Sequence, residues 1–210
     1  MPPVVALRRA YPSIFGAPVL TAVDPRIFSL RYFTHCMDCG FCADQCCSYG
    51  VDIDVGNMER LRTLGPAFAA KIATPPDAWF SPQLTIDPEF PGGLHARTSA
   101  PDGACVFRAR TGRGCAIHAH CLEAGLDYHD YKPIVSVLFP LTFEAGVLVP
   151  SSEAEDGSLI CSGDGPSLYD GARGELAHYF GDAFVAETDV LKSAATAGSG
   201  PDGCAAPATR

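Results

Sequence analysis

Five cysteines lie within residues 36–47, and this density constrains the chain more than any other feature. The first four follow the spacing C-x2-C-x2-C-x3-C, and a fifth comes directly after them: Cys36, Cys39, Cys42, Cys46, Cys47. A short turning loop of this kind can aim several sulfur atoms at one point. The bacterial ferredoxin run has the same spacing, with three of its cysteines on one four-iron cluster. Here Cys47 stands where that run usually has a proline. The run therefore predicts an inorganic centre.

A second group of cysteines extends from residue 105 to residue 121. The loops could also hold zinc, which takes four tetrahedral thiolate or imidazole ligands. Eight cysteines fit two sites, or one site with spare thiols. Buried, inert cysteines and disulfides are the weaker alternatives, because such dense spacing rarely serves packing alone. We expect an iron–sulfur cluster, slightly favoured, or a zinc ion, with ligands among Cys36, Cys39, Cys42, Cys46, Cys47, Cys105, Cys115 and Cys121.

Composition narrows the partners and the cell compartment. The 210 residues carry a formal net charge of -9, and 47% are hydrophobic, enough for a real core. Phosphate contacts and anionic membrane surfaces both need clustered Lys and Arg, so neither nucleic acid nor a membrane is expected. No apolar run approaches the roughly 18 residues that span a bilayer, and no secretory signal is visible. Clustered thiols then indicate a metal-binding protein of the reducing cytoplasm.

We expect three parts along the chain. Residues 1–30, punctuated by prolines, predict a Pro-rich N-terminal arm. Residues 31–192 predict a cysteine-cluster metal-binding domain, and residues 193–210, rich in small residues, predict a disordered tail. The expected fold class is α+β: a small, irregular, metal-stabilised domain with short strands and helices around the cysteine loops.

Local patterns predict the individual elements. Residues 51–54 read as a short strand with Asp54 as the N-cap of a following helix. Pro66 is expected to split the apolar helical spacing of residues 58–72 into two short helices. Residues 116–126 predict a helix that ends near Gly125, whereas residues 74–103 read as loop.

Farther along the chain, β-branched residues dominate. Residues 134–138 and 142–149 predict two short strands or a hairpin, with a turn at residues 144–146. Residues 158–161 predict a third strand, in which Cys161 is either a buried strand cysteine or a late metal ligand. Residues 175–192 predict one long helix.

Arginines and histidines lie beside both cysteine groups. Arg108, Arg110 and Arg113 could offset the negative charge of thiolates, although a solvated basic loop is the plainer interpretation. Each of His35, His118 and His120 could ligate zinc but is more often an outer partner or exposed. The remaining histidines, His95, His129 and His178, are expected to be ordinary surface or partly buried residues. The carboxylates of Asp38 and Asp44 in the first cysteine loop are expected to be solvated or to cap the backbone.

Five motifs, in this order, resemble those of the YkgJ-type cysteine-cluster proteins, described as zinc- or iron-chelating domains, and of a related uncharacterised cysteine-rich family. They are Cys42-Ala-Asp-Gln-Cys46-Cys47, Gly103-Ala-Cys105-Val-Phe107, Cys115-Ala-Ile-His118, Lys132-Pro133 and Phe139-Pro140. The resemblance covers about residues 30–185. It implies these ligands: Cys36, Cys42, Cys46, Cys47, Cys105 and Cys115.

The chain departs from this pattern at Ser136, where such families usually have a further cysteine. Serine is a poor ligand for a soft metal. Either the site lacks one ligand, or Cys39 or Cys121 takes its place.

Three hypotheses of function follow, and the sequence leaves open whether the protein is an enzyme. The first is a metal-chelating protein for electron transfer, redox sensing or metal handling. The second is a metalloenzyme in which Ser136 leaves a metal position open, with His118 and Asp54 as catalytic neighbours. The third is an interaction module that docks a protein partner through the arm and the C-terminal helix.

Overall fold

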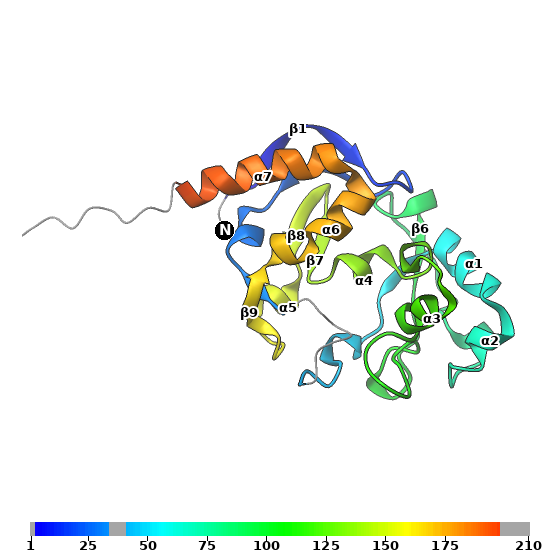
Figure 1. Cartoon of the computed structure of the whole chain (residues 1–210). Coiled ribbons are helices and arrows are strands. Elements are labelled where there is room, and N and C mark those ends of the chain that lie inside the picture. The colour runs from blue at the N-terminus through cyan, green and yellow to red at the C-terminus, as the bar shows by residue number, and fades with distance from the viewer. Residues whose placement is uncertain (1–2, 34–40, 198–210) are drawn as a thin grey trace, which may run out of the picture.

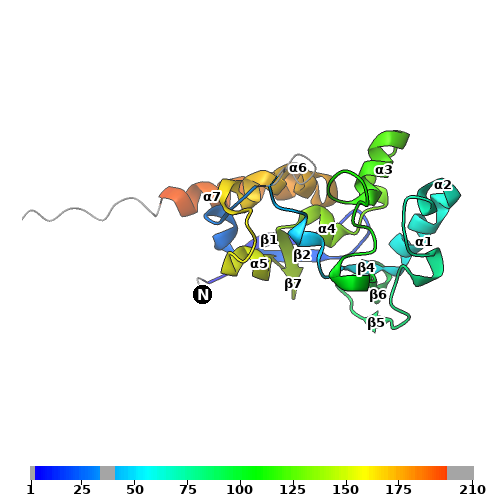
Figure 2. The same ribbon diagram turned by 90° about the horizontal axis from the view of Figure 1, so that it is seen from below.

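The computed structural model describes residues 3–33 and 41–197, and the remaining residues lie outside the description. The fold class is α+β, with several small sheets and short helices (Figure 1). Figure 2 shows the two C-terminal helices along one side of the molecule and α1 to α3 gathered at one end. Within the described residues, no helix is both long and apolar enough to span a bilayer.

The largest sheet has the strand order β1-β2-β8-β7. Its strands are β1 (Val5–Pro12), β2 (Val19–Val23), β7 (Leu141–Glu144) and β8 (Val147–Pro150). β2 pairs with β8 in parallel, whereas β1–β2 and β7–β8 are antiparallel pairs. The predicted turn between β7 and β8 is confirmed, with Ala145 and Gly146 at positive φ.

The expected N-terminal arm is wrong, because residues 5–23 form two strands of this sheet. Leu7 and Leu20 point into the core and are buried. Pro12 and Pro18 lie at or beyond the strand ends, where a missing N–H breaks little pairing.

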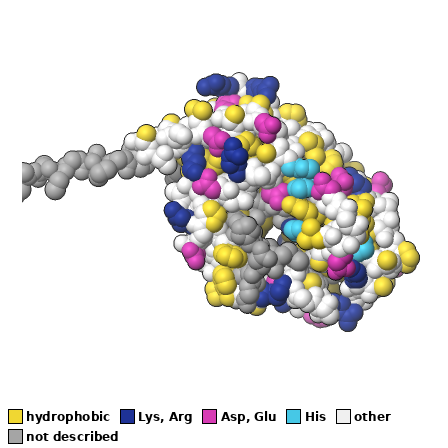
Figure 3. Space-filling model, in the orientation of Figure 1, with side chains coloured by type: hydrophobic (Ala, Val, Ile, Leu, Met, Phe, Trp, Pro, Cys, Tyr) yellow, Lys and Arg dark blue, Asp and Glu magenta, His cyan; other side chains and the backbone are white. Residues whose placement is uncertain are grey.

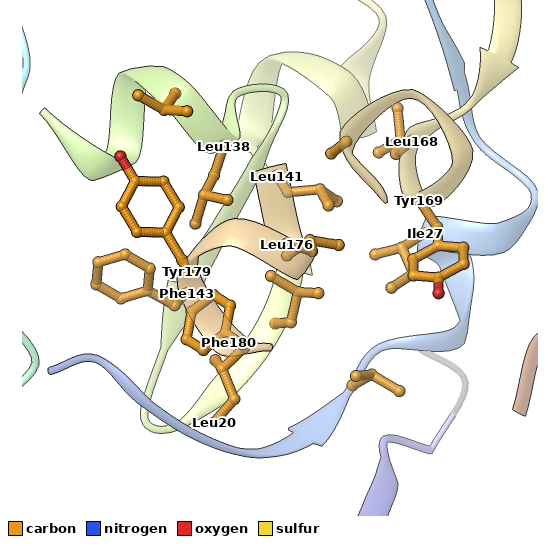
Figure 4. Close-up of a cluster of buried hydrophobic side chains, with 14 of the residues drawn as sticks. Leu20, Ile27, Leu138, Leu141, Phe143, Leu168, Tyr169, Leu176, Tyr179 and Phe180 are labelled. Carbon is orange, nitrogen blue, oxygen red and sulfur yellow. The ribbon is translucent and has the colours of Figure 1, made fainter. Parts of the chain in front are cut away.

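Two consecutive helices, α6 (Leu168–Phe180) and α7 (Asp182–Ala197), contribute to the first hydrophobic cluster. Figure 4 shows its centre, where leucines and aromatic rings from the sheet, α4 and α6 interdigitate. The prediction of one helix over residues 175–192 is wrong, because Gly181 interrupts it with φ +82°. The expected disordered tail is wrong for residues 193–197, which extend α7, and the rest of it lies outside the described residues.

The second hydrophobic cluster lies under a three-stranded antiparallel sheet of order β4-β6-β5. The strands are β4 (Asp52–Asp54), β5 (Thr85–Ile86) and β6 (Leu94–Arg97), and the helices are α1 (Val55–Thr63), α2 (Gly65–Ala69) and α3 (Ala116–Ala124). The Asp54 cap is confirmed by a 2.7 Å bond from the Asn57 N–H, and Pro66 begins α2. Gly125 ends α3 at φ 66°. Residues 74–103 are not all loop, since they include β5 and β6.

The remaining elements are small. β3 (Arg31–Tyr32) pairs with β9 (Ser162–Ser167), and α5 (Ser152–Asp156) follows β8. Short 3-10 turns occur at Pro25–Phe28, Gln45–Cys47, Pro76–Ala78, Pro91–Gly93, Pro101–Gly103 and Tyr128–Asp130. The strand predicted at residues 158–161 is wrong, because these residues form a turn before β9.

The strand predicted at residues 134–138 is also wrong, since this segment is helix α4 (Ile134–Leu138). Ile134, Val137 and Leu138 are its buried residues. Their spacing of three and four residues is that of one helical face. Ser136, on the same helix, lines the cavity described next.

Candidate metal centre

A cavity of about 490 Å³ lies where the two hydrophobic clusters meet. Figure 3 shows a hollow in this face of the molecule, with hydrophobic side chains along one side of it. Six cysteines from three distant stretches line the cavity: Cys42, Cys46, Cys47, Cys105, Cys115 and Cys161. None of the seven described cysteines is in a disulfide.

The first cysteine loop turns tightly. Ala43 and Asp44 both have positive φ, at 49° and 55°, and the 3-10 turn Gln45–Cys47 follows. Such backbone is sparsely populated by non-glycine residues and is often found at ligand sites. The turn brings Cys42, Cys46 and Cys47 to one wall of the cavity.

Asp44 joins this loop to the second one, contrary to the expectation that its carboxylate is solvated. Its buried Oδ1 accepts hydrogen bonds from Arg113 Nε at 3.2 Å and from the Gly114 N–H at 3.1 Å. The position of the Cys42 loop therefore depends on residues about seventy positions later in the chain.

Arg113 also donates from Nη2 to the Cys42 sulfur, at 3.2 Å. A guanidinium N–H at this distance favours the thiolate form of a cysteine. Arg108 donates to the Ala43 carbonyl oxygen, and Arg110 is exposed. Of the three arginines, Arg113 has the contact that the charge-offset hypothesis requires.

Cys105 and Cys115 occupy the second loop. The Cys105 N–H donates to the Cys47 carbonyl oxygen at 2.7 Å, so the two cysteine loops lie side by side. Burial raises the pKa of the Cys105 thiol, and the neighbouring Cys115 raises it further. A metal that binds there would displace the thiol proton.

The other cysteines fall into three groups. Cys121, an expected ligand, does not line the cavity: it is fully buried in α3 within the second cluster, where burial raises the pKa of its thiol to about 11. Cys161, left open above, is buried and lines the cavity. Cys36, Cys39 and Cys204 lie outside the described residues, as does His35.

The cavity also has polar lining residues other than cysteine, which we call its polar wall. His118, Tyr128, Lys132, Ser136 and Glu175 line it. The His118 ring stacks on the Tyr128 ring, with centroids 4.1 Å apart. Burial and the nearby Lys132 charge lower the pKa of His118 to about 4, so its imidazole is neutral near pH 7. His120, in contrast, packs on Phe68 in the second cluster.

A hydrogen-bonded network behind this wall holds it in place. Glu175 accepts from the Tyr128 hydroxyl at 2.7 Å through Oε1, and its Oε2 lies 2.6 Å from His129 Nε2. The other His129 nitrogen contacts Asp127, and its ring stacks on His178. The sequence carries no local signal for this role of His129 and His178, because residues 127–129 and 175–178 are far apart in the chain.

Asp127, His129 and His178 also have ligand atoms within 4.8 Å of one another, the arrangement that a metal ion could use. The two imidazole rings, however, are stacked 14° from parallel with centroids 3.7 Å apart. The in-plane lone pairs of such rings do not converge on one ion. Both His129 nitrogens already contact carboxylates, so we assign these residues to the network that supports the wall.

A comparison with protein-family models, curated proteins and solved structures finds no match to this chain.

Proposed function

We propose that this protein binds an iron–sulfur cluster or a zinc ion through the cysteines that line the cavity. One observation supports the proposal: cysteines from residues 42–47, 105–115 and 161 line one cavity, although up to 119 positions separate them in the chain. Thiolates are the ligands that both Fe–S clusters and zinc prefer. The resemblance to the YkgJ-type proteins points to the same chemistry.

The donors around the sulfur atoms support an iron–sulfur cluster slightly more than zinc. Hydrogen bonds to sulfur tune the reduction potential of Fe–S clusters, and Arg113 is such a donor. A cavity of about 490 Å³ is also far larger than one zinc ion needs. In our proposal the cluster serves electron transfer, redox sensing or metal handling in the cytoplasm.

A metalloenzyme is the second candidate, and Ser136 supports it. This residue lines the cavity at the position where the resembling families have a cysteine. A metal that lacks this ligand would keep a position open for water or a substrate. The interaction-module hypothesis has less support, because its expected arm is part of the main sheet.

Anaerobic purification of the full chain, followed by elemental analysis and a visible absorption spectrum, tests the proposal. We expect iron with sulfide and a brown colour, or zinc in a colourless protein. A Cys42→Ser variant should lose most of its metal. A Cys121→Ser variant is the matched control, since that buried thiol lies outside the cavity wall, and it should keep the metal.

Far-UV circular dichroism of both variants separates loss of a ligand from loss of folding. Wild-type protein without iron and without zinc would contradict the proposal. So would equal metal content in the two folded variants.

A further inference from the structure

We infer that the polar half of the cavity binds a small organic anion, with Lys132 as the partner of its anionic group. This inference deepens the proposed function, on which it rests: the anion would lie beside the metal that the thiols hold. It assigns a class of ligand to the polar lining residues of the cavity that are not cysteines.

Lys132 is the key residue. It lines the cavity directly after the Tyr128–Asp130 turn, where its N–H donates to the Tyr128 carbonyl oxygen at 2.8 Å. It is only partly exposed, and no ion pair of its ammonium group is found in the described part of the chain. His118 and Glu175 line the same cavity.

The carboxylate of Glu175 forms no ion pair with this ammonium group within the residues that the structure describes, and its ion pair is with His129. Both oxygens of Glu175 already have partners, the Tyr128 hydroxyl and the His129 ring. Partly buried cations normally have a counter-charge, because removing a charge from water is costly. An ammonium group that lines a cavity and has no ion pair among residues 3–33 and 41–197 is therefore the complement of an anion.

The remaining lining indicates an organic anion rather than an inorganic one. Apolar side chains surround the polar wall, among them Phe107, Val135 and Phe139. Small-molecule sites have volumes of roughly 300–1,000 Å³ and combine apolar walls with a few placed polar groups. The cavity fits this description, and the stacked rings of His118 and Tyr128 offer a flat surface to an aromatic or branched carboxylate.

Benzoate and benzamide are suitable probes, because they share a shape and differ in charge. Isothermal titration of the full-length, anaerobically purified protein should show tighter binding of benzoate than of benzamide. In Lys132→Gln, benzoate affinity should fall at least tenfold, as expected for one lost charge-assisted hydrogen bond. Lys132→Arg should retain much of the affinity.

Lys71→Gln is the matched control, since Lys71 pairs with Glu123 on the surface and does not line the cavity. It should bind benzoate as the wild type does. Equal binding of the two probes by wild-type protein, no binding of benzoate, or unchanged affinity in Lys132→Gln would overturn the inference.

Metal content measured on the same samples separates this inference from the proposed function. Lys132→Gln should keep its metal. If that variant loses metal together with benzoate binding, Lys132 is a counter-charge of the thiolates and the inference fails, although the metal site stands. If wild-type protein has no metal, the proposed function fails instead.

Discussion

At the scale of single residues, the cysteine loops depend on side chains that are not cysteines. Asp44 is buried between the loops and bonds Arg113 and Gly114, while Arg113 also bonds the Cys42 sulfur. A thiol can bind a metal only if the backbone directs its sulfur atom toward the ion, and these hydrogen bonds hold the backbone around Cys42 in place. Metal sites are thus built by the neighbours of the ligands as much as by the ligands.

Asp24 is a second buried carboxylate, and its environment makes stability depend on pH. Burial by itself would raise its pKa, but the hydrogen bonds and charge of Arg26 outweigh burial, so the pKa lies below its usual 3.8. Arg26 Nε and Nη2 lie 2.9 and 2.6 Å from Asp24 Oδ2. The charged carboxylate therefore stabilises the fold at neutral pH, and this contribution is lost as pH falls through the folded-state pKa.

We predict that Asp24→Asn lowers the free energy of unfolding by about 1–3 kcal/mol at pH 7, the usual worth of a hydrogen bond to a charged group. The difference from wild type should shrink as pH falls below 3.8, because the wild-type carboxylate is then protonated in the unfolded chain and increasingly in the folded one. Urea denaturation at pH 7 and pH 3 measures this. Asp77→Asn, at an exposed position, should change little; a pH-independent difference for Asp24→Asn would refute the argument.

At the scale of elements, Gly181 decides how the C-terminal helices pack. It has φ +82° and ψ 165°, a region that is essentially closed to other residues. The chain turns there, so that Phe184 and Val185 of α7 join the same cluster as Leu176 and Phe180 of α6. One continuous helix would carry its second half away from this core.

We predict opposite effects for two glycine substitutions in this region. Gly181→Ala should destabilise the protein by about 1–3 kcal/mol, the cost of a strained backbone. Gly174→Ala should stabilise it by about 0.5–1 kcal/mol, because Gly174 lies inside α6 with no atom near the added methyl group. The melting temperatures of the two variants, compared with that of the wild type, measure these opposite changes in stability. Equal melting temperatures would show that the break at Gly181 is not required.

At the scale of the whole molecule, the cavity lies at the junction of the two hydrophobic clusters. Cys42 and Cys161 belong to the first cluster, Cys105 and Cys115 pack against the second, and Tyr128 packs against both. A metal bound to these thiols would cross-link the two halves of the core. Its binding free energy would then add to the stability of the folded state.

We therefore predict that metal removal destabilises the whole protein. A ligand at 100 times its Kd adds about 2.7 kcal/mol, so chelation should lower the melting temperature clearly. Hydrogen exchange should show the largest loss of protection in residues 41–47 and 105–115, and a smaller loss in β2 and β8. Re-addition of the metal is the control, and identical melts with and without metal would contradict a stabilising role.

The sequence by itself determined the features that depend on a few neighbouring residues. The Asp54 cap, the start of α2 at Pro66, the end of α3 at Gly125 and the turn at Gly146 each follow from local backbone chemistry. The α+β class follows from the same local periods. The two groups of cysteines, at residues 36–47 and 105–121, can likewise be recognised from their spacing in the sequence.

Only the tertiary structure decided which residues share the cavity. The spacing predicts Cys121 as a ligand and leaves Cys161 open between two roles, yet Cys121 packs inside α3 and Cys161 lines the cavity. The residues of α4 have β-branched side chains typical of strands, but burial of one helical face outweighs that preference. The pairing of β2 with β8 and the contact between His129 and Glu175 likewise join residues more than forty positions apart. Burial and pairing over such separations depend on the whole packed chain, and no local pattern encodes them.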